Sequence, residues 1–327
     1  MVYYFEALIR SPHISISNLL FNWQNQPLSL ISLFIEITSI AFYFFGTKRL
    51  SKKGRSWSKW KTLSYIAGIT TIVIAVQSGL ASYDDTNFSV HVVQHILLMA
   101  IAPIFLSLSA PVTLALQALK RNNQVRLLKV INSPIIKLIT FPLVGASIYY
   151  FTPVLFFLTP LYPYSLVHPV VHELTHLEFL IAGMLFWWPI IGLDSEKWRF
   201  PHGAKIISLF VGMPFDAFIG ISIMNLSHSI APQHTLADTR VGGAILWGAG
   251  ETITVAAIMI ILLQWMRQDA KEAVRIDRQL DAQRHKDQLE QKRLIQQLDN
   301  SQDKEELPPW AAAHNTWYKN PNPEQNT

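Results

Sequence analysis

Two pairs of histidines in this sequence have the spacing of metal ligands on a helix. His91 and His95 are four residues apart, as are His172 and His176, and residues four apart project from one face of a helix. Imidazole binds copper, zinc and iron. The second pair lies in the segment HELTH, which places Glu173 beside two imidazoles as in the zinc site of many metalloproteases. The two pairs therefore predict a metal or haem site.

Thioether groups and one further imidazole have the same spacing. Met99 follows His95 by four residues, and Met224 precedes His228 by four. Thioether sulfur favours copper(I), and the sequence contains no cysteine that would supply a thiolate. We therefore predict a copper site in which the two histidine pairs are the main ligands and Met99, Met224 and His228 add further contacts.

Carboxylates within apolar segments form a second group of candidates. Ionisable side chains at membrane depth are rare, and they face the interior of a helix bundle or water. In this protein such carboxylates could accept hydrogen bonds from the ligating histidines and so orient them, or they could exchange protons. Glu173, beside the second histidine pair, could orient the imidazoles in the same way. The candidates inside apolar segments are Glu36, Glu178, Asp216 and Glu251.

The elements that position these residues are predicted to be transmembrane helices. Of the 327 residues, 50% are hydrophobic and only 15% are charged, below the roughly 25% of soluble domains. Several apolar runs approach the about 20 residues needed to cross a bilayer. We predict an all-α, polytopic membrane bundle of about seven helices. The predicted spans are 28–45, 63–82, 91–116, 135–158, 170–192, 204–226 and 243–265.

Lysine and arginine alternate between the loops and predict the orientation of the bundle. The loop 46–61 has seven basic residues and the segment 117–134 has four, whereas the loop YDDTNFS has none. Basic loops stay inside, so the N-terminus and the histidine pairs are predicted to lie outside and the C-terminus inside. The predicted parts are an outer segment (1–27), the membrane domain (28–265), a charged cytoplasmic helix (266–300) and a poorly ordered tail (301–327).

The net charge of +5 does not indicate nucleic acid as a partner. The basic residues lie mainly in loops beside apolar segments, where they determine topology and contact anionic lipid. The lipid bilayer is thus an expected partner, and nucleic acid is not.

Two enzyme classes remain as alternatives. A zinc protease needs a third ligand and an open position for water. Asp194 cannot supply that ligand, because it follows His176 by 18 residues, about 27 Å along one helix. Glu178 or Glu251 could. A haem-binding oxidoreductase also fits the histidines, but both pairs lie at one membrane level and would hold one haem at most.

Several longer segments resemble the CtaG family, assembly factors for caa3-type cytochrome c oxidase. These are HVVQHILLMAIAPIFLSLSAPVTL (91–114), HELTHLEFLIAGMLFWWPIIG (172–192), LADTRVGGAILWGAGE (236–251) and EAVRIDRQLD (272–281). The resemblance covers about 85–320, and residues 1–84 match in topology alone. Ser109-Ala110 stands where the family pattern has a glycine before the proline.

The resemblance implies a seven-span, non-enzymatic factor of the inner (cytoplasmic) membrane that serves the respiratory chain. Its partners would be cytochrome c oxidase subunits or other oxidase assembly factors, and its role copper delivery or insertion. A metal-free scaffold remains a further alternative. The positions that match the family's motifs are His91, His95, His172, His176 and Asp238.

Overall fold

The computed structural model of the protein describes residues 17, 22–23, 27–194 and 201–300. Every element assigned within these residues is a helix, which confirms the all-α prediction. The chain divides into two compact units, Met1–Leu263 and Gln264–Thr327. The predicted tail, 301–327, lies outside the described residues, as does most of the predicted outer segment, 1–27.

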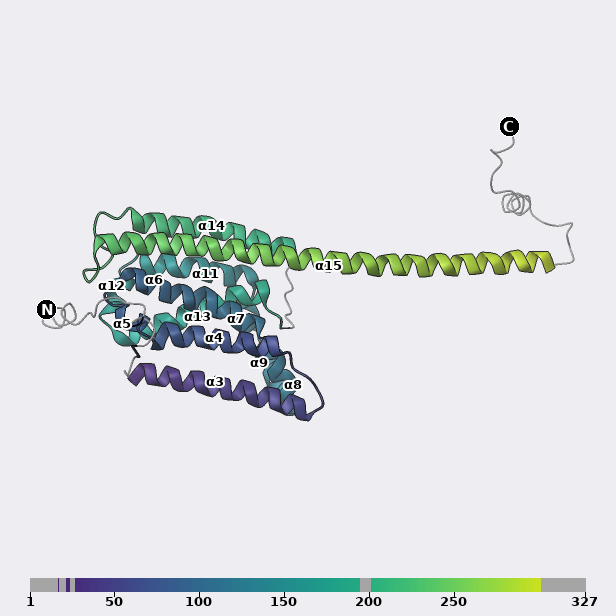
Figure 1. Ribbon diagram of the computed structural model, residues 1–327, viewed down its shortest axis with the longest axis horizontal. Helices are drawn as coiled ribbons and strands as arrows, with labels where there is room; N and C mark the ends of the chain where they lie inside the picture. Colours follow the sequence, from purple (N-terminus) through teal and green to yellow (C-terminus); the bar gives the residue numbers. More distant parts are fainter. Residues whose placement is uncertain (1–16, 18–21, 24–26, 195–200, 301–327) are drawn as a thin grey trace, which may run out of the picture. The chain divides into compact units, whose positions relative to one another are not determined.

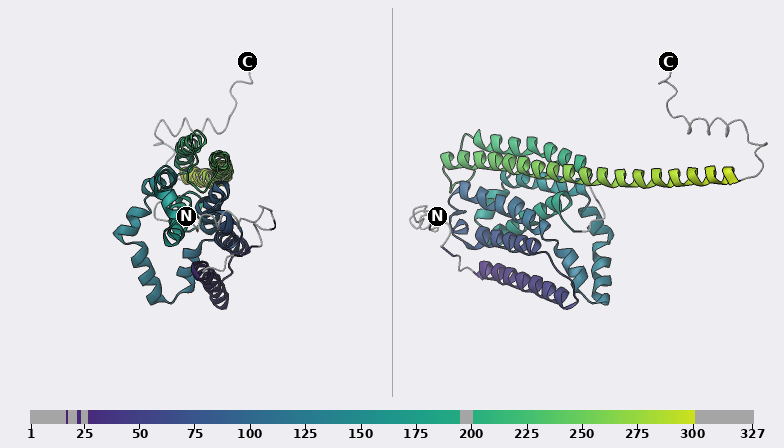
Figure 2. Two further views of the ribbon diagram at one scale, coloured as in Figure 1. Left: turned by 90° about the vertical axis from the view of Figure 1, so that its left-hand side faces the viewer. Right: turned by 45° about the vertical axis from the view of Figure 1, so that its right-hand side comes forward.

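The helices of the first unit run alongside one another as a bundle (Figures 1 and 2). In chain order the elements are α3 (Pro27–Lys52), α4 (Lys59–Gln77), α5 (Leu80–Tyr83), α6 (Phe88–Ile96), the π-helical turn η1 (Leu97–Ile101), α7 (Ala102–Leu108), α8 (Pro111–Ala118), α9 (Arg121–Ile131), α10 (Pro134–Ile139), α11 (Pro142–Phe157), α12 (Leu161–Leu166), α13 (Pro169–Ile191), α14 (His202–Met224) and α15 (Leu236–Asn300).

Six segments of the described chain are long and apolar enough to cross a membrane. They correspond to six of the seven predicted spans. The remaining prediction, 135–158, is divided between α10 and the 16-residue α11. The division falls before Pro142, because a proline lacks an N–H and disfavours helical geometry in the residue before it. Helix α11 is therefore only about 24 Å long, and it packs against α13 and α14.

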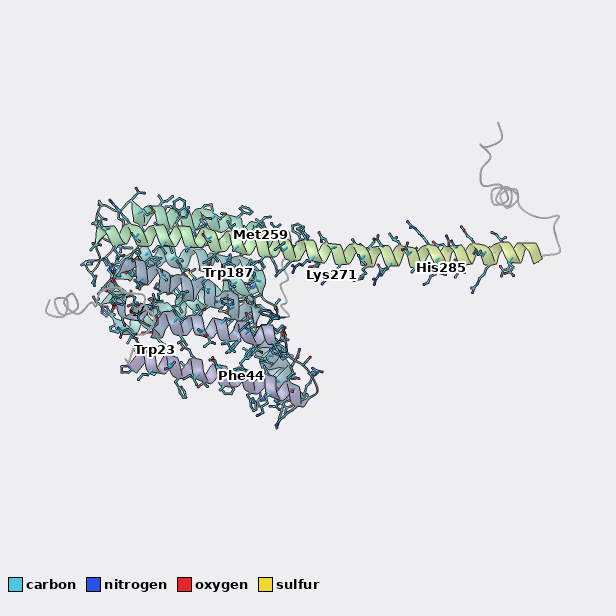
Figure 3. All side chains as sticks on the ribbon, in the orientation of Figure 1. Trp23, Phe44, Trp187, Met259, Lys271 and His285 are labelled. Atoms are coloured by element: carbon cyan, nitrogen blue, oxygen red, sulfur yellow. The ribbon has the colours of Figure 1, made fainter. Side chains whose placement is uncertain are left out.

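The second unit contains the remainder of α15, which ends at Asn300. A helix is predicted from the sequence over this range, 266–300. Residues 264–297 are exposed. Lys271 and His285 are among the side chains on this part of α15 (Figure 3).

The predicted span 91–116 ends early, at a sharp turn between α7 and α8. Ala110 adopts a left-handed backbone with φ of 51° and is fully buried. A left-handed conformation costs an L-residue about 1–2 kcal/mol, whereas glycine adopts it freely. This geometry explains why the family pattern has a glycine before the proline. The turn is held by Asp194, which accepts hydrogen bonds from the backbone N–H groups of Val112 (3.3 Å) and Thr113 (2.6 Å).

Replacing Ala110 with glycine is expected to stabilise the protein by about 1 kcal/mol, because it relieves the left-handed strain. Thermal unfolding of purified protein in detergent should show a melting temperature raised by about 2–4 °C. The matched control is Ala118→Gly, a buried position near the end of α8, which should unfold at a lower temperature because glycine weakens a helix. A lower melting temperature for Ala110→Gly would contradict the strain argument.

Helix α13 approaches η1 and α7 closely, and this approach places the two histidine pairs opposite each other. A Cβ atom at Gly183 would collide with the carbonyl oxygen of Met99, so only glycine permits this distance. Pro103 cannot donate the N–H that would close an α-helical hydrogen bond to that carbonyl, and the chain passes through the π turn η1 here. Such turns occur frequently at functional sites.

Candidate metal centre

The structure brings the four imidazoles of the two pairs into one buried cluster. The Nε2 atoms of His91 and His95 lie 2.7 Å apart. The centroids of the His91 and His172 rings are 5.3 Å apart, and those of His95 and His176 are 5.6 Å apart. The His172 and His176 rings are separated by 4.6 Å. The pairs from α6 and α13 thus form one site rather than two.

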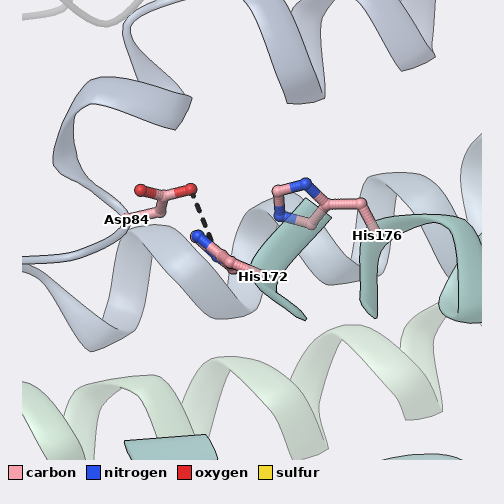
Figure 4. A group of neighbouring side chains, drawn as sticks. All are labelled: Asp84, His172 and His176. Atoms are coloured by element: carbon pink, nitrogen blue, oxygen red, sulfur yellow. Dashed lines mark ion pairs between the residues drawn. The ribbon is translucent and has the colours of Figure 1, made fainter. Parts of the chain in front are cut away.

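Asp84 completes this cluster from the end of α5. Its Oδ2 atom lies 3.7 Å from Nε2 of His172, as Figure 4 shows. Asp84, His172 and His176 each offer one ligand atom, and these atoms lie within 4.8 Å of one another. The neighbouring Asp85 places Oδ1 3.6 Å from Nδ1 of His172, and its side chain is 60% exposed. His172 therefore stands between a buried and an exposed carboxylate.

Asp84 and Asp85 were not among the site residues predicted from the sequence, where the loop YDDTNFS was used only as a loop without basic residues. The available signal was two adjacent carboxylates in a loop predicted to lie on the same side of the membrane as both histidine pairs.

Burial makes a negative charge costly at Asp84. Burial, and then the charge of Asp85, raise the pKa of the Asp84 carboxyl well above its usual range. A nearby cation favours the ionised form of a carboxyl group, so a bound metal ion would offset the cost of the charge on Asp84.

The ligand atoms of Asp84, His172 and His176 lie close enough together for one metal ion, and the rings of His91 and His95 lie beside this group. With metal–nitrogen distances of about 2.0–2.1 Å, two ligating imidazoles have nitrogens about 3.3 Å apart and ring centroids about 5 Å apart. The centroid distances between neighbouring rings of the cluster range from 4.4 Å for His91 and His95 to 5.6 Å for His95 and His176. The nitrogens of His91 and His95 are at hydrogen-bond distance, so they would move about 0.6 Å apart to bind the same ion.

Each of the four rings also has a buried nitrogen without a hydrogen-bond partner. These atoms are Nδ1 of His91, Nδ1 of His95, Nε2 of His172 and Nε2 of His176. Unsatisfied buried polar atoms are uncommon in native proteins and require an explanation. A metal ion beside Asp84 would provide one for Nε2 of His172, which lies 3.7 Å from the Asp84 carboxylate.

Aromatic side chains surround the imidazoles. The ring centroid of Phe179 lies 4.0 Å from that of His95, and the centroid of Tyr162 lies 4.8 Å from that of His91. Tyr162 shares a hydrogen bond of 2.6 Å with Nε2 of His234, and burial lowers the pKa of His234. An apolar wall restricts water and lowers the local dielectric around a metal site.

Asp238, on the first turn of α15, positions the helix that carries His91 and His95. Its carboxylate accepts hydrogen bonds from the backbone N–H groups of Phe88 and Ser89 and from the Ser89 hydroxyl. These groups form the first turn of α6, where backbone donors have no partner within the helix. Asp238 therefore acts as the cap of α6.

Replacing Asp238 with alanine is expected to destabilise the protein by about 1–2 kcal/mol, because the N-terminal donors of α6 lose their acceptor. Thermal unfolding should show the loss, and Asp238→Asn, which retains an oxygen acceptor, should recover part of it. The control is Glu178→Ala, which removes an exposed carboxylate. Equal melting temperatures for Asp238→Ala and Glu178→Ala would refute the capping role.

The remaining predicted residues near α13 and α14 have different surroundings. Oε2 of Glu173 lies 3.4 Å from Nδ1 of His176 and can orient that ring. Glu178 is exposed and does not join the cluster, because two residues rotate a helix by about 200° from His176. His228 is also exposed, and its Nδ1 lies 3.0 Å from the carbonyl oxygen of Ser229.

Two of the other candidates share a small cavity with His95. This cavity has a volume of about 40 Å³ and is lined by His95, Met99 and Asp216, among others. Its size suits one or two water molecules. Met99 and Asp216 thus lie beside the cluster and outside the ring of imidazoles.

The structure does not bring the last three candidates to the imidazoles. Met224 packs on α15, where a Cβ at Gly243 would lie 3.0 Å from its Cγ. Glu36 is buried on α3 with both carboxylate oxygens unpartnered, and α3 packs mainly on α4 and α8. Glu251 has one buried oxygen without a partner and follows Gly250, which lies against Asp216.

Residues 41–268 match the family described as cytochrome c oxidase caa3 assembly factor (Caa3_CtaG). The chain belongs to this family. The match to Caa3_CtaG begins at residue 41, earlier in the chain than the resemblance of the sequence motifs, which begins at about residue 85. It therefore includes the last part of α3 and all of α4. It also ends earlier, so the segment EAVRIDRQLD lies outside it.

Curated relatives of this Caa3_CtaG member are found in mycobacteria. The chain is 31% identical over 258 residues to the uncharacterized protein ML1998 of Mycobacterium leprae, covering 73% of this chain and 39% of that protein. It is 31% identical over 266 residues to Mb0105 of Mycobacterium bovis, covering 76% and 40%. The chain thus spans about two fifths of the length of these relatives. No solved structure matches the chain.

Proposed function

We propose that this protein holds a copper ion at the histidine cluster and passes it to a haem–copper cytochrome c oxidase during assembly. Membership of the Caa3_CtaG family supports the oxidase as client. The observation that supports the copper site is the convergence of four buried imidazoles and the carboxylate of Asp84, with Nε2 of His172 and of His176 unpartnered.

The donor set suits transient binding of copper as cargo. Neutral imidazoles bind copper, and the carboxylate of Asp84 adds negative charge without enclosing the ion in thiolates. Glu173 orients His176, Asp238 holds the start of α6, and the aromatic side chains exclude water. The site lies at the end of the bundle that the basic loops predict to be outside, in a protein of the inner membrane.

Elemental analysis and an optical spectrum of anaerobically purified protein test the proposal. We expect one copper per chain after exposure to copper(I), and no Soret band. A Soret band would favour the haem alternative. Protein that binds no copper would contradict the proposed site and leave a metal-free scaffold.

A zinc peptidase is the second candidate, because Asp84 supplies the third ligand that HELTH lacks. However, the rings of His91 and His95 pack against His172 and His176, whereas a peptidase needs an open position for water, and Glu173 lies against His176. The variant Glu173→Gln separates the two candidates. A peptidase would lose its activity and keep its metal, whereas a copper carrier would show no peptidase activity before or after the change.

A further inference from the structure

A cavity lies where the last turns of α3, the first turns of α4 and the loop between them meet. Helices α3 and α4 pack side by side, and they are joined at the end of the bundle away from α5 and the histidine cluster (Figure 1). Basic residues predict that this end is inside. The cavity has a volume of about 570 Å³, within the range of small-molecule sites. It is therefore large enough for a molecule rather than a single ion.

The lining of this cavity changes from polar to apolar along both helices. Near the loop it includes Ser51 of α3 and Lys59 of α4, and seven residues away on the same helices it includes Phe44 and Ile66. Residues seven apart share a helix face, and seven residues span about 10.5 Å. Phe44, Ile66 and the neighbouring Leu63 are exposed large apolar side chains. The cavity thus has a polar end at the loop and an apolar end within the membrane helices.

Three basic side chains line the polar end, namely Lys48, Arg55 and Lys59. All three are exposed, and within the described part of the chain none of them forms an ion pair or a side-chain hydrogen bond. No acidic residue is among the described residues that line the cavity, and the sequence has none between Glu36 and Asp84. The polar end therefore combines three cationic groups with no lining carboxylate.

Other side chains hold the loop between α3 and α4 in place. Nζ of Lys53 donates a hydrogen bond of 2.9 Å to the carbonyl oxygen of Gln117, and Nζ of Lys61 lies 4.6 Å from the centroid of the Trp57 ring. Trp57 donates its Nε1–H to the hydroxyl of Tyr43 at 3.0 Å. These contacts fix the loop to α8 and α3, so the cavity is formed before a ligand binds and less ordering is needed on binding.

We propose that this cavity binds one anionic phospholipid, with its phosphate at the three basic side chains and the start of an acyl chain at the apolar end. Lysine and arginine form charge-assisted hydrogen bonds with phosphate, and basic clusters beside membrane helices bind anionic headgroups. An uncharged lipid would leave the cations without a counter-charge, and a free phosphate would leave the apolar end empty. An anionic lipid satisfies both ends. This proposal is independent of the copper site.

Native mass spectrometry of the purified full-length protein in detergent, titrated with phosphatidylglycerol or phosphatidylcholine of the same acyl chains, tests the proposal. We expect one phosphatidylglycerol to bind at least about tenfold more tightly than phosphatidylcholine. The variant Arg55→Gln/Lys59→Gln should bind phosphatidylglycerol about thirty-fold more weakly, because it removes two cations from the phosphate site. An excess of glycerol phosphate, which carries the phosphate without acyl chains, should not displace the lipid.

The control variant Arg126→Gln/Lys129→Gln makes the same change of charge at exposed positions of α9, in another segment predicted to be inside. It should bind phosphatidylglycerol as the unchanged protein does. Melting temperatures of both variants should equal that of the unchanged protein, since all four positions are exposed. Equal affinity for the two lipids, or equal losses in the two variants, would overturn the proposal. So would displacement of the lipid by glycerol phosphate, because the cavity would then be a site for a soluble phosphate.

Discussion

Replacing His95 with alanine is expected to weaken copper binding by more than about 100-fold, since loss of a ligand should cost at least as much as loss of a residue that supports one. His95 is a buried ring of the cluster with several ring contacts. It lies at hydrogen-bond distance from His91, and its ring is near those of His176 and Phe179. Competition titrations with a copper(I) chelator measure the affinity.

The matched control for this variant is His228→Ala. His228 is an exposed histidine of the loop after α14, and its loss should leave the affinity unchanged. Because His95 is buried, His95→Gln provides a second variant that retains most of the side-chain volume. A melting temperature for each variant separates lost ligation from lost folding. Unchanged affinity in a folded His95 variant would exclude this cluster as the copper site.

The double variant His91→Ala/His172→Ala is expected to abolish the assembly of active oxidase in cells. It removes one ligand from each helix, so only His95 on α6 and His176 on α13 remain of the four imidazoles. Oxidase activity and haem spectra of membranes should fall to the level of a strain that lacks the protein. Copper content of the isolated oxidase should fall in parallel.

Two comparisons make this result specific to copper. Glu178→Ala, an exposed change on α13, should assemble oxidase normally. Excess copper in the medium should partly restore oxidase in the double variant, if delivery is the missing step. Normal oxidase assembly in cells that accumulate the folded double variant would show that metal handling by this cluster is not the function, and a scaffold would remain.

Local patterns were enough to predict the membrane helices and the two histidine pairs. Apolar runs of about 20 residues require a spanning helix wherever they occur, and a spacing of four places two side chains on one helix face. The same rules failed where proline intervened. Pro111 and Pro142 start new helices and divide segments that hydropathy joins.

The sequence by itself determined which residue types could bind copper and on which helices they stand. Only the tertiary structure decided which of them meet. It joined the pairs of α6 and α13, added Asp84, assigned Asp238 to the cap of α6, and left His228 and Glu178 exposed. The reason is physical: the approach of two helices depends on close contacts such as that of Gly183 with the backbone carbonyl of Met99, and no local spacing encodes which distant segment provides that contact.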